Sequence, residues 1–204
     1  MNRIKLAIVG WVFLVVLSTV ASETSKPDDV QTQLPQWLSA QAAYTALDHF
    51  TGSWRGAGKG KWGTSIAEKT YTVILDGRAR CRTGSSVYPV QERNPNGEVH
   101  KTHALFALIE DGGGLIFTEY DNEGFIARYA LDLASSEANK TWVFELVSGD
   151  NLPPNFRARL TLHAPVDEHY MEIFELDFGS KGYTTYLTNR LSRVVDAAVA
   201  GGCQ

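Results

Sequence analysis

Hydrophobic and polar residues alternate in short runs along most of this chain, a pattern that predicts β-strands. The runs begin after Phe50 and recur at short, regular spacing, with glycine-containing turns such as Asp76-Gly77 between them. Together with the glycine-rich segment that opens the series, they give about ten strands. The predicted strands cover residues 67–75, 78–83, 103–110, 115–120, 125–132, 142–147, 156–163, 170–178 and 183–193.

So many antiparallel strands in one domain must form two sheets or close on themselves, because open sheet edges invite aggregation. Closure is the simpler solution for strands joined by hairpins. We therefore expect an all-β fold, a single antiparallel up-and-down barrel of about eight to ten strands. An N-terminal helix is predicted over residues 34–49, where Trp37, Leu38 and Tyr44 contribute to one apolar face, and a brief C-terminal helix over 194–200.

The first residues have the order of a secretory signal peptide. Arg3 and Lys5 precede an apolar run over residues 6–17, and small residues follow up to Ala21. The run is about 12 residues long, whereas a helix needs roughly 20 to span a bilayer, so an uncleaved anchor is the weaker interpretation. We expect residues 1–21 to be the signal peptide, 22–33 a flexible polar leader and 34–204 the barrel domain, secreted or periplasmic and without stable membrane insertion.

Composition adds two constraints. The net charge of −4 gives no electrostatic reason to expect nucleic acid or an anionic membrane as a partner. The chain has 2 cysteines, Cys81 and Cys203. In an exported protein such a pair is more often a disulfide than a metal or redox site, and two buried free thiols are the alternative.

The segment FTGSWRGAGKGKWG, residues 50–63, combines glycines with two tryptophans. A phosphate-binding P-loop is excluded, because Gly58-Lys59-Gly60 lacks the following hydroxyl residue and the glycine spacing is wrong. In a small barrel, glycines let the first strand bend sharply and approach its neighbour closely. A large ring such as Trp54 can then fill the closed end.

Gly52-Ser53-Trp54 has the Gly-x-Trp form that opens lipocalins and their calycin relatives. LDHFTGSWRGAGKG and the later ILDGRARC resemble a bacterial family of exported lipocalin-like domains with no assigned function, and the resemblance covers residues 47–193. Haem-binding nitrobindin-type barrels share a similar opening. The resemblance implies that Trp54 packs on an arginine of the last strand, with Arg190 preferred over Arg193.

The same resemblance has two further implications. Lipocalins often tie their tail to the barrel wall, which favours the bond between the two cysteines. The related haem barrels use a histidine near the end of the chain, whereas the last predicted strand here, GYTTYLTNRLSRV, contains none. We therefore expect no cofactor, with haem as a disfavoured possibility.

The segment RARCRT is the most informative for a ligand. Arg78, Arg80 and Arg82 alternate with small residues, so one face of this strand carries three guanidinium groups. Charged side chains usually face solvent. If Cys81 faces outward to reach the tail, however, the arginines point into the barrel, where they could hold an anionic head group such as a fatty-acid carboxylate.

No metal site and no catalytic constellation emerge from the remaining residues. His100 and His103 have metal-like spacing, but residues three apart in a strand point to opposite faces. No serine lies in a Gly-x-Ser-x-Gly frame. Glu172 and Glu175 are interpreted as part of a solvated strand face. The sequence therefore leaves open whether the chain is an enzyme, and it favours a non-enzymatic role.

The leading hypothesis is a barrel that binds a small hydrophobic or amphipathic molecule, with an anionic one as a variant. The alternatives are an enzyme on the same scaffold, an isomerase or hydrolase, a haem-binding barrel, or a structural module with a solid core. Aromatic residues on the predicted strands would either line a cavity or fill the core. They are Phe117, Tyr129, Trp142, Phe144 and Tyr186.

Overall fold

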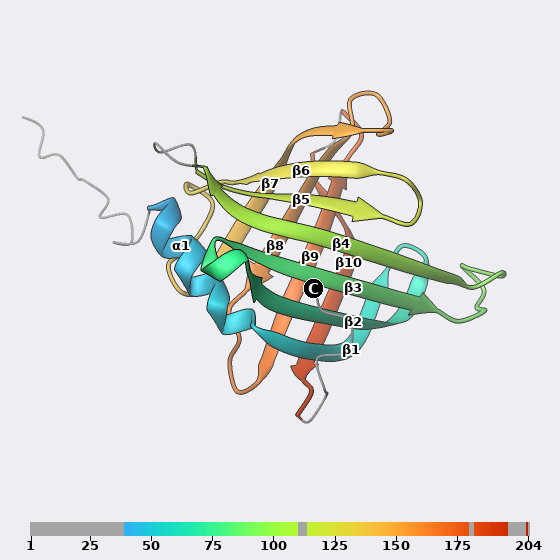
Figure 1. The fold of residues 1–204 in the computed structure, drawn as a ribbon. Helices are drawn as coiled ribbons and strands as arrows, with labels where there is room; N and C mark the ends of the chain where they lie inside the picture. The colour runs from blue at the N-terminus through green and yellow to red at the C-terminus, as the bar shows by residue number, and fades with distance from the viewer. Residues whose placement is uncertain (1–38, 110–113, 180–181, 196–202, 204) are drawn as a thin grey trace, which may run out of the picture. The chain divides into compact units, whose positions relative to one another are not determined.

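The computed structural model describes residues 39–109, 114–179, 182–195 and 203, and these form a closed antiparallel barrel of ten strands (Figure 1). Each strand pairs with its neighbours in sequence, and the last strand pairs with the first. This confirms the predicted all-β, up-and-down barrel. The strands are β1 (Gly52–Gly60), β2 (Gly63–Ile74), β3 (Ala79–Tyr88), β4 (Glu98–Ile109), β5 (Gly114–Asp121), β6 (Ile126–Leu131), β7 (Thr141–Asp150), β8 (Arg157–His163), β9 (His169–Asp177) and β10 (Thr184–Arg193).

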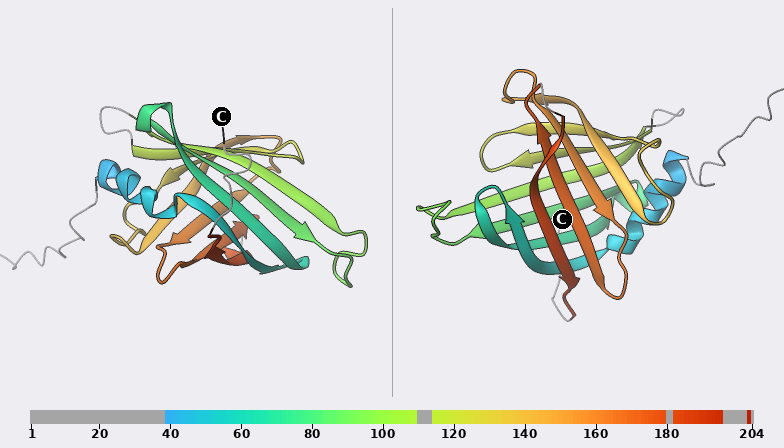
Figure 2. Two further views of the ribbon diagram at one scale, coloured as in Figure 1. Left: turned by 60° about the horizontal axis from the view of Figure 1, so that its bottom comes forward. Right: turned by 180° about the vertical axis from the view of Figure 1, so that it is seen from behind.

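A short helix, α1 (Ala40–Ala46), and a 3₁₀ turn, η1 (Leu47–Phe50), precede the barrel and cover one end of it (Figures 1 and 2). The Ser39 side chain caps α1 by accepting a hydrogen bond from the backbone N–H of Ala42 at 3.1 Å. The helix is held to the wall where the indole N–H of Trp142 donates to the carbonyl of Ala43 at 3.0 Å. We call this end of the barrel the closed end.

Several predictions about the termini fall outside the described residues. These are the signal peptide, the leader, residues 34–38 of the predicted N-terminal helix and most of the predicted C-terminal helix. Within the described residues, no helix is long and apolar enough to cross a membrane.

The glycine-rich strand β1 fits closely against β10. A methyl group at Gly56 would overlap the carbonyl oxygen of Arg190, and one at Gly58 would overlap the side chains of Ser65 and Asn189. Any larger residue would push β10 away from β1. The glycines therefore allow the two terminal strands to approach closely enough to close the barrel.

Trp54 plugs the closed end, as the resemblance to lipocalins implied. It is 1% exposed, and its indole N–H donates to the carbonyl of Phe50 at 2.6 Å. The guanidinium of Arg193 lies over the indole, 4.2 Å from the ring centroid, so the partner is Arg193 and not the preferred Arg190. The register explains this correction: Trp54 pairs directly with Arg193, whereas Arg190 is exposed on the outer face.

Candidate functional site

A cavity of about 340 Å³ occupies the half of the barrel away from α1. Its mouth is formed by the β1–β2, β5–β6, β7–β8 and β9–β10 connections, which contribute Trp62, Glu123, Phe156 and Phe178. Its volume lies at the lower end of the range of roughly 300–1,000 Å³ that is usual for small-molecule sites. The apolar part of the wall includes Phe117, Phe125, Ala127, Leu152, Phe156, Leu160, Phe174 and Leu176.

Charged side chains form the floor of the cavity, in the middle of the barrel. Glu172 of β9 lies 3.4 Å from the ammonium nitrogen of Lys69 on β2 and 3.4 Å from a guanidinium nitrogen of Arg82 on β3. Asn189 of β10 donates to the same carboxylate at 2.9 Å, and Arg82 also pairs with Glu119 of β5. We call these five residues the floor cluster. Its two cations and two carboxylates balance in charge.

Glu172 and Arg82 of the floor cluster are both held in their charged forms. Burial opposes ionisation of Glu172, but Lys69, Arg82 and the hydrogen bond from Asn189 hold the pKa of its carboxyl below the usual range. Burial disfavours the charge of Arg82 as well, yet Glu119 and its other neighbours keep the guanidinium pKa well above its ordinary value. These two groups are suited to orienting a bound molecule, because neither the Glu172 carboxylate nor the Arg82 guanidinium changes its charge near pH 7.

Two tyrosines lie next to the floor cluster on the side of the closed end. Burial raises the pKa of the Tyr71 hydroxyl, which lies beside Arg82. Burial likewise raises the pKa of Tyr170, whose hydroxyl lies near that of Tyr71. Both phenols therefore stay protonated and neutral. The ring of Tyr170 packs edge-on against Trp54 at 4.8 Å, so this layer joins the floor to the plug.

Several buried polar atoms of the floor are unpaired. Among the described residues, Arg82 Nε, Thr102 Oγ1, Ser65 Oγ and Asn189 Oδ1 find no hydrogen-bond partner. Arg82 and Thr102 line the cavity itself. A buried polar atom without a partner costs about 1–3 kcal/mol, so native proteins rarely gather several of them in one place.

The arginines of the RARCRT segment have three different environments. Arg82 points into the barrel and is 2% exposed. Arg80 points toward the closed end, where it pairs with Asp48 at 2.7 Å and stacks over the ring of Tyr44 at 3.9 Å. Arg78 precedes β3 and is exposed, because the strand starts one residue after it. Only Arg82 of the predicted anion-binding set therefore lines the cavity.

Cys81 faces outward between these inward arginines, and it is bonded to Cys203 of the tail with 6.1 Å between the Cα atoms. The pairing fits the predicted disulfide. It also fits the argument that a bond to the tail turns the alternating arginines inward.

The predicted aromatic residues divide between the cavity and the core. Phe117 and Tyr129 stack with centroids 4.4 Å apart and, with Tyr186, line the cavity. Trp142 and Phe144 are fully buried and pack in the core at the closed end. Large rings fill the core near α1. The sequence pattern does not distinguish these core rings from the aromatic residues that line the cavity.

Sequence reasoning missed most of the floor cluster. The sequence places Glu172 on a solvated face, but it is 4% exposed and faces the interior. The sequence does not single out Lys69, Glu119 or Asn189, since a charged or amide residue inside a strand is usually solvated. Their spacing along the strand does indicate an inward position. Lys69 lies two residues from both Ala67 and Tyr71, so it shares their face of β2.

The mouth of the cavity carries negative charge. His100 Nδ1 lies 2.9 Å from Glu123 Oε1, and Glu98 lies close to both. The indole N–H of Trp62 donates to the Tyr186 hydroxyl at 2.6 Å. Over the whole cavity, Lys61, Lys69 and Arg82 face five acidic residues. The acidic residues are Glu98, Glu119, Asp121, Glu123 and Glu172.

Comparison with known proteins identifies the fold alone. No protein-family model matches the chain, and no curated protein matches it. Among solved structures the chain is similar to Rv2717c from M. tuberculosis, with 15% sequence identity and a TM-score of 0.53, over 75% of this chain and 98% of that one. At this level of identity the similarity extends to the barrel architecture and no further.

Proposed function

We propose that this protein is an exported lipocalin-like barrel that binds a small amphipathic molecule, with the apolar part in the upper cavity and an uncharged polar group on the floor. The observation that carries the proposal is the set of unpaired polar atoms at the base of an apolar cavity. A bound hydroxyl, amide or carbonyl group would supply the missing hydrogen bonds of Arg82 Nε and Thr102 Oγ1, the two such atoms whose residues line the cavity. A structural module with a solid core would need neither an apolar cavity nor polar atoms without hydrogen-bond partners at its base.

The charge balance supports an uncharged head group. Arg82 and Lys69 are already neutralised by Glu119 and Glu172, so a carboxylate placed on the floor would add a third anion to a cluster whose charges balance. The acidic mouth would repel the same ligand on entry. This replaces the fatty-acid carboxylate of the sequence-based hypothesis with a neutral amphiphile. At about 30 Å³ per non-hydrogen atom, the cavity suits a ligand of about ten such atoms.

A matched ligand series tests the head-group class. Decanol, decanoate and decylamine share one alkyl chain and differ in charge, and each can compete with a fluorescent amphiphile bound in the barrel. We expect decanol to bind at least about tenfold more tightly than decanoate, a difference of about 1.4 kcal/mol. Tighter binding of decanoate would refute the neutral-head proposal. Tightly bound haem with a Soret band would refute the ligand class altogether.

Two pairs of variants locate the binding site. Ala127→Trp places a large ring in the cavity and should abolish probe binding, whereas Arg128→Trp, on the outer face of the same strand, should not. Thr102→Val removes an unpaired hydroxyl from the floor without changing its shape. The substitution should weaken the binding of decanol by about three- to tenfold, because one hydrogen bond contributes about 0.5–1.5 kcal/mol. The stability of the protein should stay unchanged or increase. A loss of stability with unchanged affinity would mean that Thr102 serves the fold and not the ligand.

A further inference from the structure

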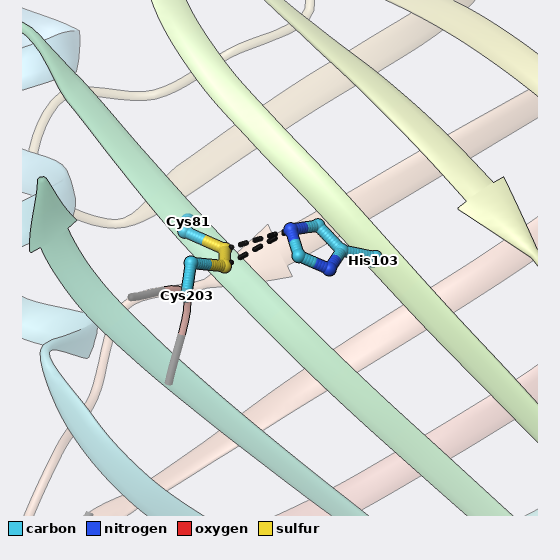
Figure 3. A group of neighbouring side chains, drawn as sticks. All are labelled: Cys81, His103 and Cys203. Carbon is cyan, nitrogen blue, oxygen red and sulfur yellow. Dashed lines mark hydrogen bonds between the residues drawn. A yellow bond between two sulfur atoms is a disulfide. The ribbon is translucent and has the colours of Figure 1, made fainter. Parts of the chain in front are cut away.

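A second group of reactive side chains lies on the outer wall of the barrel. Cys81 of β3, His103 of β4 and Cys203 of the tail come together there (Figure 3). The Nε2 atom of His103 lies 3.3 Å from the sulfur of Cys81 and 3.0 Å from the sulfur of Cys203. Since Cys81 faces outward while Arg82 faces inward, this cluster lies on the other side of the wall from the cavity.

The composition of the cluster matches a soft metal site. Its two sulfurs and one imidazole nitrogen lie within 4.8 Å of one another. Thiolate and imidazole are the ligands that Zn²⁺ and Cu⁺ prefer, and two thiolates with one histidine leave an open coordination position. We propose that Cys81, His103 and Cys203 bind one Zn²⁺ or Cu⁺ ion when their disulfide is reduced. The disulfide is then the oxidised, metal-free state of the same site.

The geometry requires little movement for this change. With metal–sulfur bonds of about 2.3 Å and a metal–nitrogen bond of about 2.0 Å, tetrahedral ligand atoms lie about 3.5–3.8 Å apart. The distances of 3.0 and 3.3 Å from His103 to the two sulfurs are already near that value. Only the sulfurs must separate, and a Cα–Cα distance of 6.1 Å leaves room for that by side-chain rotation.

Two of the three ligands are fixed by the barrel itself. Cys81 pairs with Leu105 and His103 pairs with Thr83 in the ladder between β3 and β4, which holds both side chains on the same outer face. Cys203 then completes the site from the tail. A metal ion would therefore replace the disulfide as the link between the tail and the wall.

The reducing step balances with a dithiol as the reductant. The dithiol breaks the bond between Cys81 and Cys203, gives two electrons and two protons to the cysteines, and leaves as its own disulfide. Metal binding then releases the thiol protons to solvent. Binding should therefore strengthen as the pH rises through the thiol pKa range.

Metal titration of the full-length protein tests the proposal. The protein is reduced with dithiothreitol, freed of reductant under argon, and checked by circular dichroism. It is then titrated with Zn²⁺ against a chromophoric zinc chelator, and separately with Cu⁺ against bicinchoninate. We expect one ion per chain in the reduced protein and none at this site in the disulfide form. The two arms show which ion is preferred, and a Co²⁺ titration should give the visible spectrum of tetrahedral cobalt with thiolate ligands.

Variants show whether these three residues are the ligands. His103→Ala and Cys203→Ser should each weaken binding by at least about 100-fold, more than the loss usual for an outer-shell residue. His100→Ala is the matched control, because that histidine lies in the Glu98–His100–Glu123 group at the mouth. Binding that His103→Ala leaves intact, or that His100→Ala abolishes, would overturn the proposal. So would a reduced protein that unfolds and that neither ion refolds.

Discussion

Replacing Glu172 by glutamine should destabilise the barrel strongly, because this carboxylate compensates two buried cations. The substitution keeps the shape of the side chain and removes its charge. Arg82 retains Glu119 as a partner, whereas Lys69, only 7% exposed, loses the carboxylate that lies 3.4 Å away. Removing one member of a buried ion pair costs about 3–5 kcal/mol.

Urea unfolding measures this effect, with the midpoint compared at constant slope. Glu175→Gln is the matched control on the same strand, because Glu175 pairs with the partly exposed Arg159 at 2.8 Å on the outer face. We expect that control to cost about 1 kcal/mol or less. Adding Lys69→Met to Glu172→Gln should recover most of the lost stability, since both charges are then removed together. The reasoning is refuted if the Glu172 and Glu175 variants lose similar stability, or if Lys69→Met worsens the Glu172 variant.

The same cluster sets an acid limit on stability. The pKa of Glu172 is lowered in the folded protein, so its contribution is complete above the unfolded-state pKa of about 4.3. The contribution is lost as the pH falls through the lower, folded-state value. The difference in unfolding free energy between wild type and Glu172→Gln should therefore decrease progressively below about pH 5. A difference in unfolding free energy that stays constant down to pH 3 would mean that folding does not lower the pKa of Glu172.

Three further predictions concern the plug, the tail and the N-terminus. Trp54→Ala should cost about 3–5 kcal/mol in the same urea assay, because it empties the closed end of a buried indole. A free-thiol assay on denatured, unreduced protein should find no reactive thiol, and two thiols per chain would contradict the disulfide. N-terminal sequencing of the mature protein should begin close to Ser22, and an intact Met1 would contradict export.

The strands could be predicted from the sequence because the core of the barrel imposes a period of two on every strand. Ala158, Leu160 and Leu162 of β8 are buried while the polar residues between them are not, and this alternation is visible in the sequence. The predicted strands differ mainly at their ends. β4, for example, begins at Glu98, five residues before the predicted start at 103, because pairing with β3 continues through polar residues that have no hydrophobic signature.

The candidate site could be predicted only in part, since alternation separates the two faces of a strand without saying which one is inside. The sequence therefore allows two orientations for Arg80 and Arg82, and the outward position of Cys81 distinguishes them in the structure. The partner of Trp54 depends in the same way on the register between β1 and β10. The register depends on how the two strands pair, so it cannot be deduced from the sequence of either strand alone.

The floor cluster is more readily explained by a ligand than by stability. Buried ion pairs rarely stabilise a protein more than apolar residues of the same size, because desolvation offsets their attraction. A barrel of this size could fill its centre with aromatic rings, as it does around Phe106 and Phe144 near α1. Instead the centre holds four charged groups and unpaired polar atoms, and the cavity opens directly above them. The polar layer thus stands where the apolar core ends and the cavity begins, which is the position from which it can orient a bound polar group.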